Sequence, residues 1–484
     1  MSTIGRPFPQ DFLFGAATAA YQIEGAAHED GRRDSIWDVF CREPGAVIGG
    51  DNGDVACDHY HRYRDDVALM KRLGLQTYRF SVSWSRVRPD GGALNPAGLD
   101  FYKRLVDELR EADILPWLTL YHWDLPQALQ DRGGWTARST ADLFTEYALD
   151  MHDALGDRVP VWTTLNEPWC ASFLSYTGGE HAPGHHSIEE GLIASHHLLL
   201  GHGQTVRELR ARDASLDLGI TLNHTVADPA DPQNPADVDA ARRVDGQFNR
   251  WFLDPIHRAS YPADIVEDIR KVDAAAVASF EAAVHDGDLA VIAQPIDTQG
   301  VNYYHGDLLS GTAPEHPPVS GAPATTRPGR SPYPSDAGIH AVERGLPRTS
   351  QNWEVQPEGL TRLLRRVHDE YTGEKGVRLF VTENGAAYDD VVTDGAVHDA
   401  DRVEYVRAHL GAVLDAVDAG VDVRGYFYWS LLDNFEWAWG YAKRFGIVRV
   451  DYDTQERTPK DSALEYARII AERRLDDVST AGAR

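Results

Sequence analysis

Eight short apolar runs with helix-like stretches between them dominate this 484-residue sequence. Strands that alternate with helices are typical of βα units and a parallel sheet. Eight such units predict a single (β/α)₈ barrel, in which active sites lie at the C-terminal ends of the strands. We expect residues 1–484 to form one domain, with the barrel at about residues 8–470. The eight runs cover residues 12–17, 77–83, 115–120, 161–165, 218–222, 300–304, 378–382 and 425–429.

Three of the stretches between these runs carry helix-start signals. Asn95 precedes Pro96, a pattern that favours an N-cap followed by proline at the first helical position. Ser187, with Glu190 three residues later, indicates a capping box. Pro357 opens a stretch whose leucines follow helical spacing.

Residues 311–336 interrupt the alternation of strand-like and helix-like segments. They contain seven prolines together with glycine, threonine and serine, and they show no periodicity. Loops of this length are usually functional or unstructured. Because the segment follows the sixth run, we expect residues 306–350 to form a long loop at the active-site entrance.

Two of the apolar runs lead directly into a glutamate. One ends at Glu167, before Pro168, and the other ends at Glu383, before Asn384 and Gly385. A single such glutamate is more often a carboxylate that stabilises a helix N-terminus. In a parallel barrel, however, the two would meet at one rim. Two facing carboxyl groups are what the hydrolysis of a glycosidic bond requires.

Aromatic and amide side chains accompany the two glutamates at the predicted rim. A sugar ring presents apolar faces and an edge of hydroxyl groups, so a sugar site needs both kinds of side chain. This combination of aromatic and amide side chains indicates a carbohydrate site. The residues are His122 and Trp123 after the third run, Asn166 beside Glu167, Asn302 and Tyr304 at the sixth run, and Trp429, Glu436 and Trp437 at or after the eighth.

The chain resembles glycoside hydrolase family 1, the β-glucosidases, from about residue 8 to residue 460. Seven segments carry the resemblance, and they occur in the order typical of the family. They are FLFGAATAAYQIEG at 12–25, YRFSVSWSR at 78–86, YHWDLP at 121–126, TLNEP at 164–168, NYY at 302–304, VTENG at 381–385 and WSLLDNFEW at 429–437.

The resemblance implies a role for each matching residue. Glu167 would be the acid/base and Glu383 the nucleophile of a retaining hydrolysis, with Arg79 positioning the nucleophile. It implies no cofactor and no metal. The residues that would hold the sugar or its leaving group are Gln22, His122, Trp123, Asn166, Asn302, Tyr304, Trp353, Trp429, Glu436, Trp437 and Phe445.

The expected reaction is removal of terminal non-reducing β-D-glucosyl residues from cello-oligosaccharides and from aryl or alkyl β-glucosides. β-Fucosides and β-galactosides are expected as further substrates. We expect Arg79 to lower the pKa of Glu383 and the charge of Glu383 to raise the pKa of Glu167.

Two other functions fit the same barrel. A 6-phospho-β-glucosidase would need cationic groups at the sixth position of the sugar, where Glu436 places a carboxylate. A non-catalytic sugar-binding protein would have lost one of the two glutamates, and this chain keeps both. The chain also departs from the family near the leaving group, at His305 and at the glutamine-rich residues around Trp353, which puts the leaving-group preference in doubt.

The composition limits the kinds of binding partner that we expect for this protein. A net charge of −28 argues against nucleic acid and against an anionic membrane surface, and no apolar run approaches the roughly 18 residues of a membrane span. We therefore expect a small glycoside as partner and a cytoplasmic location. An assembly of several copies of the chain is compatible with this composition.

Cysteine and histidine usage adds two expectations. The three cysteines are expected to be free thiols, although Cys41 and Cys57 could pair. Six histidines between residues 181 and 202 could suggest a metal, but they lack compact ligand spacing. Trp84 fits either the core or the site.

Overall fold

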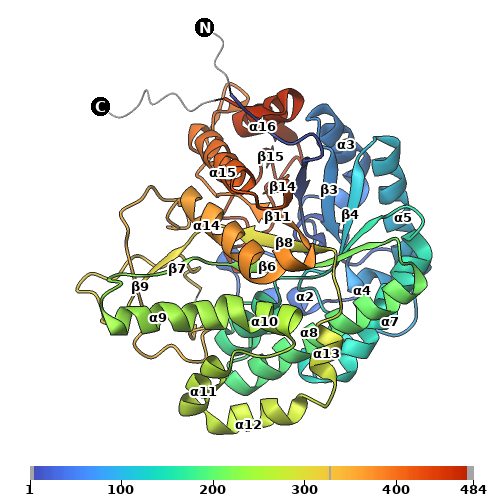
Figure 1. Ribbon diagram of the computed structural model, residues 1–484. Coiled ribbons are helices and arrows are strands. Elements are labelled where there is room, and N and C mark those ends of the chain that lie inside the picture. Colours follow the sequence, from blue (N-terminus) through green and yellow to red (C-terminus); the bar gives the residue numbers. More distant parts are fainter. Residues whose placement is uncertain (1–4, 326, 328, 477–484) are drawn as a thin grey trace, which may run out of the picture.

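The computed structural model describes residues 5–325, 327 and 329–476, and at its centre is a closed barrel of parallel strands (Figure 1). The strands follow one another around the barrel in chain order, and the last pairs with the first. Every predicted run is a barrel strand, so the predicted (β/α)₈ fold is confirmed. The strands are β2 (Leu13–Ala17), β3 (Thr77–Ser81), β4 (Leu115–Tyr121), β5 (Val161–Asn166), β6 (Asp217–His224), β8 (Thr298–Tyr303), β11 (Arg378–Asn384) and β14 (Val423–Trp429).

Helices cover the outside of the barrel (Figure 1). None in the described ranges is long and apolar enough to cross a membrane. The helices between successive strands, and after the last, are α3 (His59–Arg72), α5 (Pro96–Glu111), α7 (Ser139–Leu155), α8 (Ile188–Arg212), α14 (Pro357–Val367), α15 (Ala400–Asp418) and α16 (Asp461–Glu472). Between β6 and β8 the chain forms α9 (Pro235–Asp245), α10 (Trp251–Arg258), α11 (Ala263–Val272), α12 (Ala274–Ala283) and α13 (Asp288–Ile292).

The predicted helix starts are confirmed, with one difference in the capping. Pro96 and Pro357 are the first residues of α5 and α14. Ser187 caps α8 by accepting a hydrogen bond from the Glu190 backbone N–H at 3.2 Å. The Glu190 carboxylate does not complete the capping box, because it contacts His185 Nδ1 at 2.6 Å.

The segment predicted as a long loop, residues 306–350, begins and ends in short strands. These are β9 (Asp307–Ser310) and β10 (His340–Val342), which pair antiparallel and form a small sheet with β7 (Ala227–Pro229). The prediction of one long loop over residues 306–350 therefore missed these two strands. Strands of three or four residues are too short to show an alternating pattern.

Short elements occupy the loops at both ends of the barrel. Trp84, in one of them, is fully buried and stacks on Tyr147 with ring centroids 5.0 Å apart, so it belongs to the core. The short elements are α1 (Ala20–Ile23), α2 (Ile36–Cys41), α4 (Trp84–Val87), α6 (Gln127–Gln130), β1 (Arg6–Pro7), β12 (Val392–Thr393), β13 (Ala396–Val397), β15 (Val448–Val450), β16 (Arg457–Pro459) and β17 (Arg474–Leu475).

Aromatic rings fill the barrel interior. The ring centroid of Trp117 lies 4.8 Å from that of Phe380 and 5.0 Å from that of Phe427. The buried Trp117 indole N–H needs a partner and donates to Thr163 Oγ1 at 2.8 Å. Because the interior is packed with side chains, a ligand can bind only at the rim.

Gly385, directly after β11, lets two rim segments approach closely. A Cβ atom at this position would lie 1.7 Å from the Trp429 carbonyl oxygen at the end of β14. Only glycine avoids this contact. The glycine therefore brings the end of the strand that carries Glu383 next to the segment that leads to Glu436.

A buried ionic network connects the same two segments. The Lys460 ammonium, fully buried before α16, donates to Asp433 Oδ1 at 2.8 Å and also to the carboxylate of Asp390. Arg402 donates to Asp390 Oδ1 at 2.9 Å and also contacts Asp399. Asp390 lies in the loop after β11 and Asp433 in the loop after β14, so Lys460 joins the two loops.

Replacing Lys460 by methionine is expected to destabilise the protein by about 3 kcal/mol, because Asp390 and Asp433 each lose one buried cation and keep only Arg402 and Arg444 respectively. The matched control is Lys271→Met, since Lys271 is exposed and pairs with Asp268 on the surface, where the effect should be small. Thermal unfolding of both variants measures the difference. Equal melting temperatures for the two variants would show that the network contributes little.

Candidate active site

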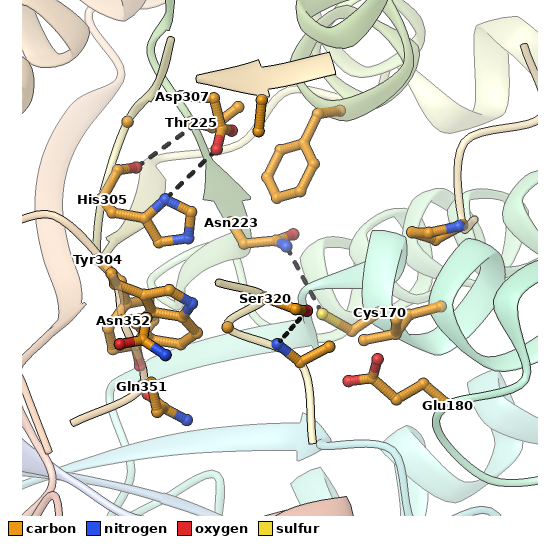
Figure 2. A pocket seen from close by; sticks show the side chains of 18 of the residues that line it. Cys170, Glu180, Asn223, Thr225, Tyr304, His305, Asp307, Ser320, Gln351 and Asn352 are labelled. Carbon is orange, nitrogen blue, oxygen red and sulfur yellow. Dashed lines mark hydrogen bonds and ion pairs between the residues drawn. The ribbon is translucent and has the colours of Figure 1, made fainter. Parts of the chain in front are cut away.

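A cavity of about 750 Å³ lies at the C-terminal ends of the barrel strands (Figure 2). Its wall includes both glutamates and most of the predicted sugar-binding residues. The predicted residues that line it are His122, Trp123, Glu167, Tyr304, Trp353, Glu383, Trp429, Glu436, Trp437 and Phe445. The four other predicted residues, Gln22, Arg79, Asn166 and Asn302, are buried and make hydrogen bonds to side chains of this wall.

The Glu383 carboxylate, in β11, is held on both of its oxygens. Arg79 Nη1 donates to Oε1 at 2.6 Å, and the Tyr304 hydroxyl donates to Oε2 at 2.7 Å. The carboxylate is almost completely buried, with 3% of the residue exposed. Two donors from β3 and from the end of β8 therefore fix its orientation.

Asn166 and Asn302 link the two glutamates. Arg79 donates its second terminal nitrogen, Nη2, to Asn166 Oδ1 at 2.6 Å. Asn302 Nδ2 donates to Glu167 Oε1 at 2.7 Å and to Asn166 Oδ1 at 3.2 Å. The pairing of β8 with β11 places Asn302 directly opposite Glu383. The hydrogen bonds thus form a continuous chain from one carboxyl group to the other.

The backbone at Glu167 is in the left-handed region, with φ of 46° directly after β5. Trp123 and Trp437 share this conformation, with φ of 77° and 51°. Non-glycine residues rarely adopt it, and each costs on the order of 1–3 kcal/mol. Three such residues in one cavity wall indicate that the surrounding fold imposes the positions of these side chains.

The pKa of both catalytic candidates is raised. For Glu167 the main cause is burial, followed by the negative charge of Glu383, while hydrogen bonds from Asn302 and Cys170 act in the opposite direction. Burial raises the pKa of Glu383, and Arg79 and Tyr304 offset part of this increase. Arg79 acts in the expected direction and lowers the pKa of Glu383, but burial, which the sequence alone does not show, outweighs it.

Stacked rings form one side of the cavity. The His122 ring lies nearly parallel to Trp429 and to Trp437, with centroids 5.7 Å and 5.9 Å away. Burial lowers the pKa of His122 well below its usual range, so the ring is neutral. The Asn166 amide donates to its Nε2 at 3.1 Å. These apolar faces suit the faces of a sugar ring.

Gln22 and Glu436 add hydrogen-bonding groups beside the rings. Gln22 Nε2 donates to the Phe435 carbonyl at 2.7 Å and lies 3.4 Å from Glu436 Oε2. Burial, with the charges of Glu383 and Glu167, raises the pKa of Glu436 to about 8. Gln22 Oε1 and His122 Nδ1 are buried without a hydrogen-bond partner among the described residues. Such unsatisfied groups are costly and mark places where ligand hydroxyls can bind.

Several cavity residues were not predicted from the sequence. Cys170, which donates to Glu167 Oε2 at 3.2 Å, could have been found from its place three residues after Glu167. Phe248 and Tyr333 carry no motif and lie far from the glutamates in sequence. Lining residues that the sequence did not predict include Trp169, Cys170, Leu174, Glu180, Phe248, Tyr333 and Gln351.

The buried histidines have other partners. His196 contacts Tyr261 and Asp288, and His202 contacts Thr164. Within residues 5–325, 327 and 329–476, no three or more His, Cys, Asp or Glu side chains are grouped to hold a metal ion. Cys41, Cys57 and Cys170 are buried free thiols, so the alternative pairing of Cys41 with Cys57 is not formed.

Comparison with known proteins agrees with this geometry. The β-glucosidase A of Thermotoga maritima is 43% identical over 98% of this chain and 99% of its own length. A bifunctional β-D-glucosidase/β-D-fucosidase of Bifidobacterium breve is 46% identical over 96% of this chain and 98% of its own. The crystal structure of a psychrophilic β-glucosidase from Micrococcus antarcticus, 54% identical, superimposes with a TM-score of 0.93 over 97% of this chain and 98% of the other.

The pattern that defines glycosyl hydrolase family 1 matches residues 4–475, almost the whole sequence. With relatives of this identity over nearly their full length, the fold, the carboxyl pair and the comparisons lead to one assignment. The chain belongs to glycosyl hydrolase family 1.

Proposed function

We propose that this protein is a retaining, exo-acting β-glycosidase that removes terminal non-reducing β-D-glucosyl residues from cello-oligosaccharides and from aryl or alkyl β-glucosides. The observation that carries the proposal is the hydrogen-bonded chain from Glu383 through Arg79, Asn166 and Asn302 to Glu167. It fixes two carboxyl groups in one sugar-sized cavity. The names of the relatives, all β-glucosidases or glucohydrolases, support the same activity.

In the first step, Glu383 attacks the anomeric carbon and Glu167 gives its proton to the departing oxygen. The C–O bond to the leaving group breaks as the ester bond to Glu383 forms. Arg79 and Tyr304 hold the attacking carboxylate in its charged form. Burial and the charge of Glu383 keep the proton on Glu167 until it is needed.

In the second step, Glu167 acts as the base. Once Glu383 is esterified, its negative charge is gone, and one cause of the raised pKa of Glu167 disappears with it. Glu167 then ionises more readily and takes a proton from water, which attacks the anomeric carbon and releases the sugar. One residue serves both steps because the first step removes the charge that held its proton.

The sugar end of the site supports a preference for glucose, with β-fucosides and β-galactosides as further substrates. Gln22 and Glu436 are placed to bind adjacent hydroxyl groups, and a missing hydroxyl would leave them unpaired. The relative from Bifidobacterium breve is named for both glucosidase and fucosidase activity. The Thermotoga maritima β-glucosidase has been crystallised with deoxynojirimycin.

The two alternative functions, a 6-phospho-β-glucosidase and a non-catalytic sugar-binding protein, are less well supported. Glu436 places a buried carboxyl group at the sugar end of the cavity, a poor partner for a phosphate group. A non-catalytic sugar-binding protein would not need the orientation that Arg79 and Tyr304 impose on Glu383. We further propose one catalytic domain in residues 1–484 and a cytoplasmic location, which the three buried free thiols favour.

Purified protein is expected to hydrolyse 4-nitrophenyl β-glucoside at near-neutral pH, and Glu383→Ala should reduce the rate by about four orders of magnitude. Azide should restore turnover of the variant, because it fits the space left by the carboxylate and attacks from the same face. The product should then be the α-glucosyl azide, identified by NMR. A β-azide would mean that Glu383 is not the nucleophile, and an inactive wild type would favour one of the alternatives.

Glu167→Ala should affect substrates according to their leaving groups. A poor leaving group needs the proton that Glu167 supplies, so kcat/KM for alkyl glucosides should fall by about 10²–10⁴-fold. A dinitrophenyl leaving group departs without that proton and should lose much less. Steady-state rates over a series of aryl and alkyl glucosides test this, and equal losses across the series would contradict the acid role.

Tyr304→Phe should move the acidic limb of the kcat/KM profile to higher pH by about one unit. The Tyr304 hydroxyl stabilises the charged form of Glu383, so its loss raises the pKa of Glu383, and activity is lost at a higher pH as the solution is acidified. Tyr303→Phe is the matched control, because the Tyr303 hydroxyl donates to the Gln356 carbonyl instead. An unmoved acidic limb in Tyr304→Phe would count against this assignment.

A further inference from the structure

The thiol of Cys170 faces the carboxyl group of Glu167 inside the cavity. Cys170 Sγ lies 3.2 Å from Glu167 Oε2, and the residue is 6% exposed. The backbone holds the two residues in this arrangement, because the Cys170 N–H donates to the Glu167 carbonyl at 3.0 Å. Burial and the charge of Glu167 raise the pKa of the Cys170 thiol well above its usual range, so the thiol keeps its hydrogen.

Asn302 determines which oxygen of Glu167 can carry a proton. Arginine only donates, so the Asn166 atom that contacts Arg79 is Oδ1, and the Asn302 atom 3.2 Å from it is the donor Nδ2. The Thr382 hydroxyl donates to Asn302 Oδ1 at 2.8 Å, which agrees with this orientation. Nδ2 therefore donates to Glu167 Oε1 at 2.7 Å. Because a neutral carboxyl group accepts mainly at the oxygen without hydrogen, the proton of Glu167 belongs on Oε2.

The Cys170 thiol fits both protonation states of Oε2, since a thiol can donate and accept a hydrogen bond. When Glu167 is neutral, its Oε2–H can donate to Sγ. When Glu167 is ionised, the S–H can donate to Oε2, and a hydrogen bond to a charged oxygen is the stronger of the two. Asn223, in β6, directs its amide at the sulfur, with Nδ2 3.6 Å from Sγ (Figure 2). This contact fixes the position of the sulfur and leaves its hydrogen free to turn.

Asn302 and Cys170 are the hydrogen-bond partners of the Glu167 carboxyl group among the residues that the structure describes. Other groups act on this pair through their charge or respond to its charge. They come from β3, from the ends of β8 and β14, from β11, and from the loops around the cavity. These charged or titratable groups are Arg79, Glu180, Tyr304, Tyr333, Glu383 and Glu436.

We propose that Glu167 carries its catalytic proton on Oε2, and that Cys170, held by Asn223, is a positioning residue that reverses its hydrogen bond when this proton leaves. In the free enzyme Sγ accepts from the Oε2–H. With substrate bound, the Oε2–H turns to the departing oxygen, and as the proton passes over, the thiol turns its own hydrogen to Oε2. The thiol thereby stabilises the new negative charge. The contact reverses again when Glu167 takes a proton from water, so the inference rests on the proposed acid/base role.

Cys170→Ala should move the basic limb of the kcat/KM profile to higher pH by about half a unit. The alanine removes a donor to the charged form of Glu167, so the pKa of Glu167 rises and its proton is kept to a higher pH. Cys170→Ser keeps a group that donates and accepts, and its limb should stay near that of the wild type. Cys57→Ala is the matched control, because Cys57 is a buried thiol that donates to the Asp433 carbonyl instead, at 3.0 Å.

The S–H stretching vibration reports the hydrogen bond of the thiol without any turnover. In infrared difference spectra, the band of Cys170 is the one that is absent from Cys170→Ala and from Cys170→Ser. It should move to lower wavenumber as the pH is raised through the pKa of Glu167, about 8, because donation to a carboxylate weakens the S–H bond. In Glu167→Gln, which cannot ionise, the band should not move.

Failure of the inference and failure of the proposed function give different results. A wild type that hydrolyses no β-glucoside would refute the proposed function. An active wild type whose S–H band stays in place across the pKa of Glu167 would overturn the inference. Equal shifts of the basic limb in Cys170→Ala and Cys170→Ser would also overturn it. Melting temperatures identify a folding defect in Cys170→Ala, and Cys170→Ser then suffices to assign the band.

Discussion

The contact between Arg79 and Glu383 is the interaction on which the site depends. A guanidinium buried in the barrel is costly unless it is paired, and here it binds the carboxylate with one nitrogen and Asn166 with another, while its Nε has no partner among the described residues. Asn166 and Asn302 then extend the hydrogen bonds from Arg79 to Glu167, so the position of Glu167 also depends on Arg79. Strands β3, β5, β8 and β11 supply these residues, so closure of the barrel is what brings them together.

Burial supplies the electrostatics of the reaction. Glu167, Glu383 and Glu436 share one cavity, where the charge of Glu383 raises the pKa of Glu167 and both charges raise the pKa of Glu436. Among the described residues, a cation contacts Glu383 alone of the three, so Glu383 is the group best able to hold the negative charge. In the proposed mechanism, esterification of Glu383 changes this balance. The acid and base functions proposed for Glu167 therefore depend on the covalent state of Glu383.

The sequence was sufficient for the strands and for the residues near them. The eight runs predicted the barrel because a buried parallel strand is a continuous apolar segment, and Glu167 and Glu383 were found because they end two of these runs. The outer cavity was harder to predict. Phe248 lies in a short helical segment between α9 and α10, and Tyr333 and Glu180 lie in loops. Tertiary contacts bring these residues to the cavity, so no local pattern marks them. The sequence identified the cation that lowers the pKa of Glu383, but it does not show the depth of burial, which raises that pKa.

The most direct test of the central claim is to trap the covalent intermediate. A 2-deoxy-2-fluoro-β-glucoside with an activated leaving group should esterify the nucleophile and then hydrolyse slowly, because the fluorine destabilises both transition states. Peptide mapping by mass spectrometry locates the label. We expect one sugar per chain, attached to Glu383, and loss of labelling in Glu383→Gln. A label on Glu167 or Glu436, or the absence of any adduct from an active enzyme, would contradict it.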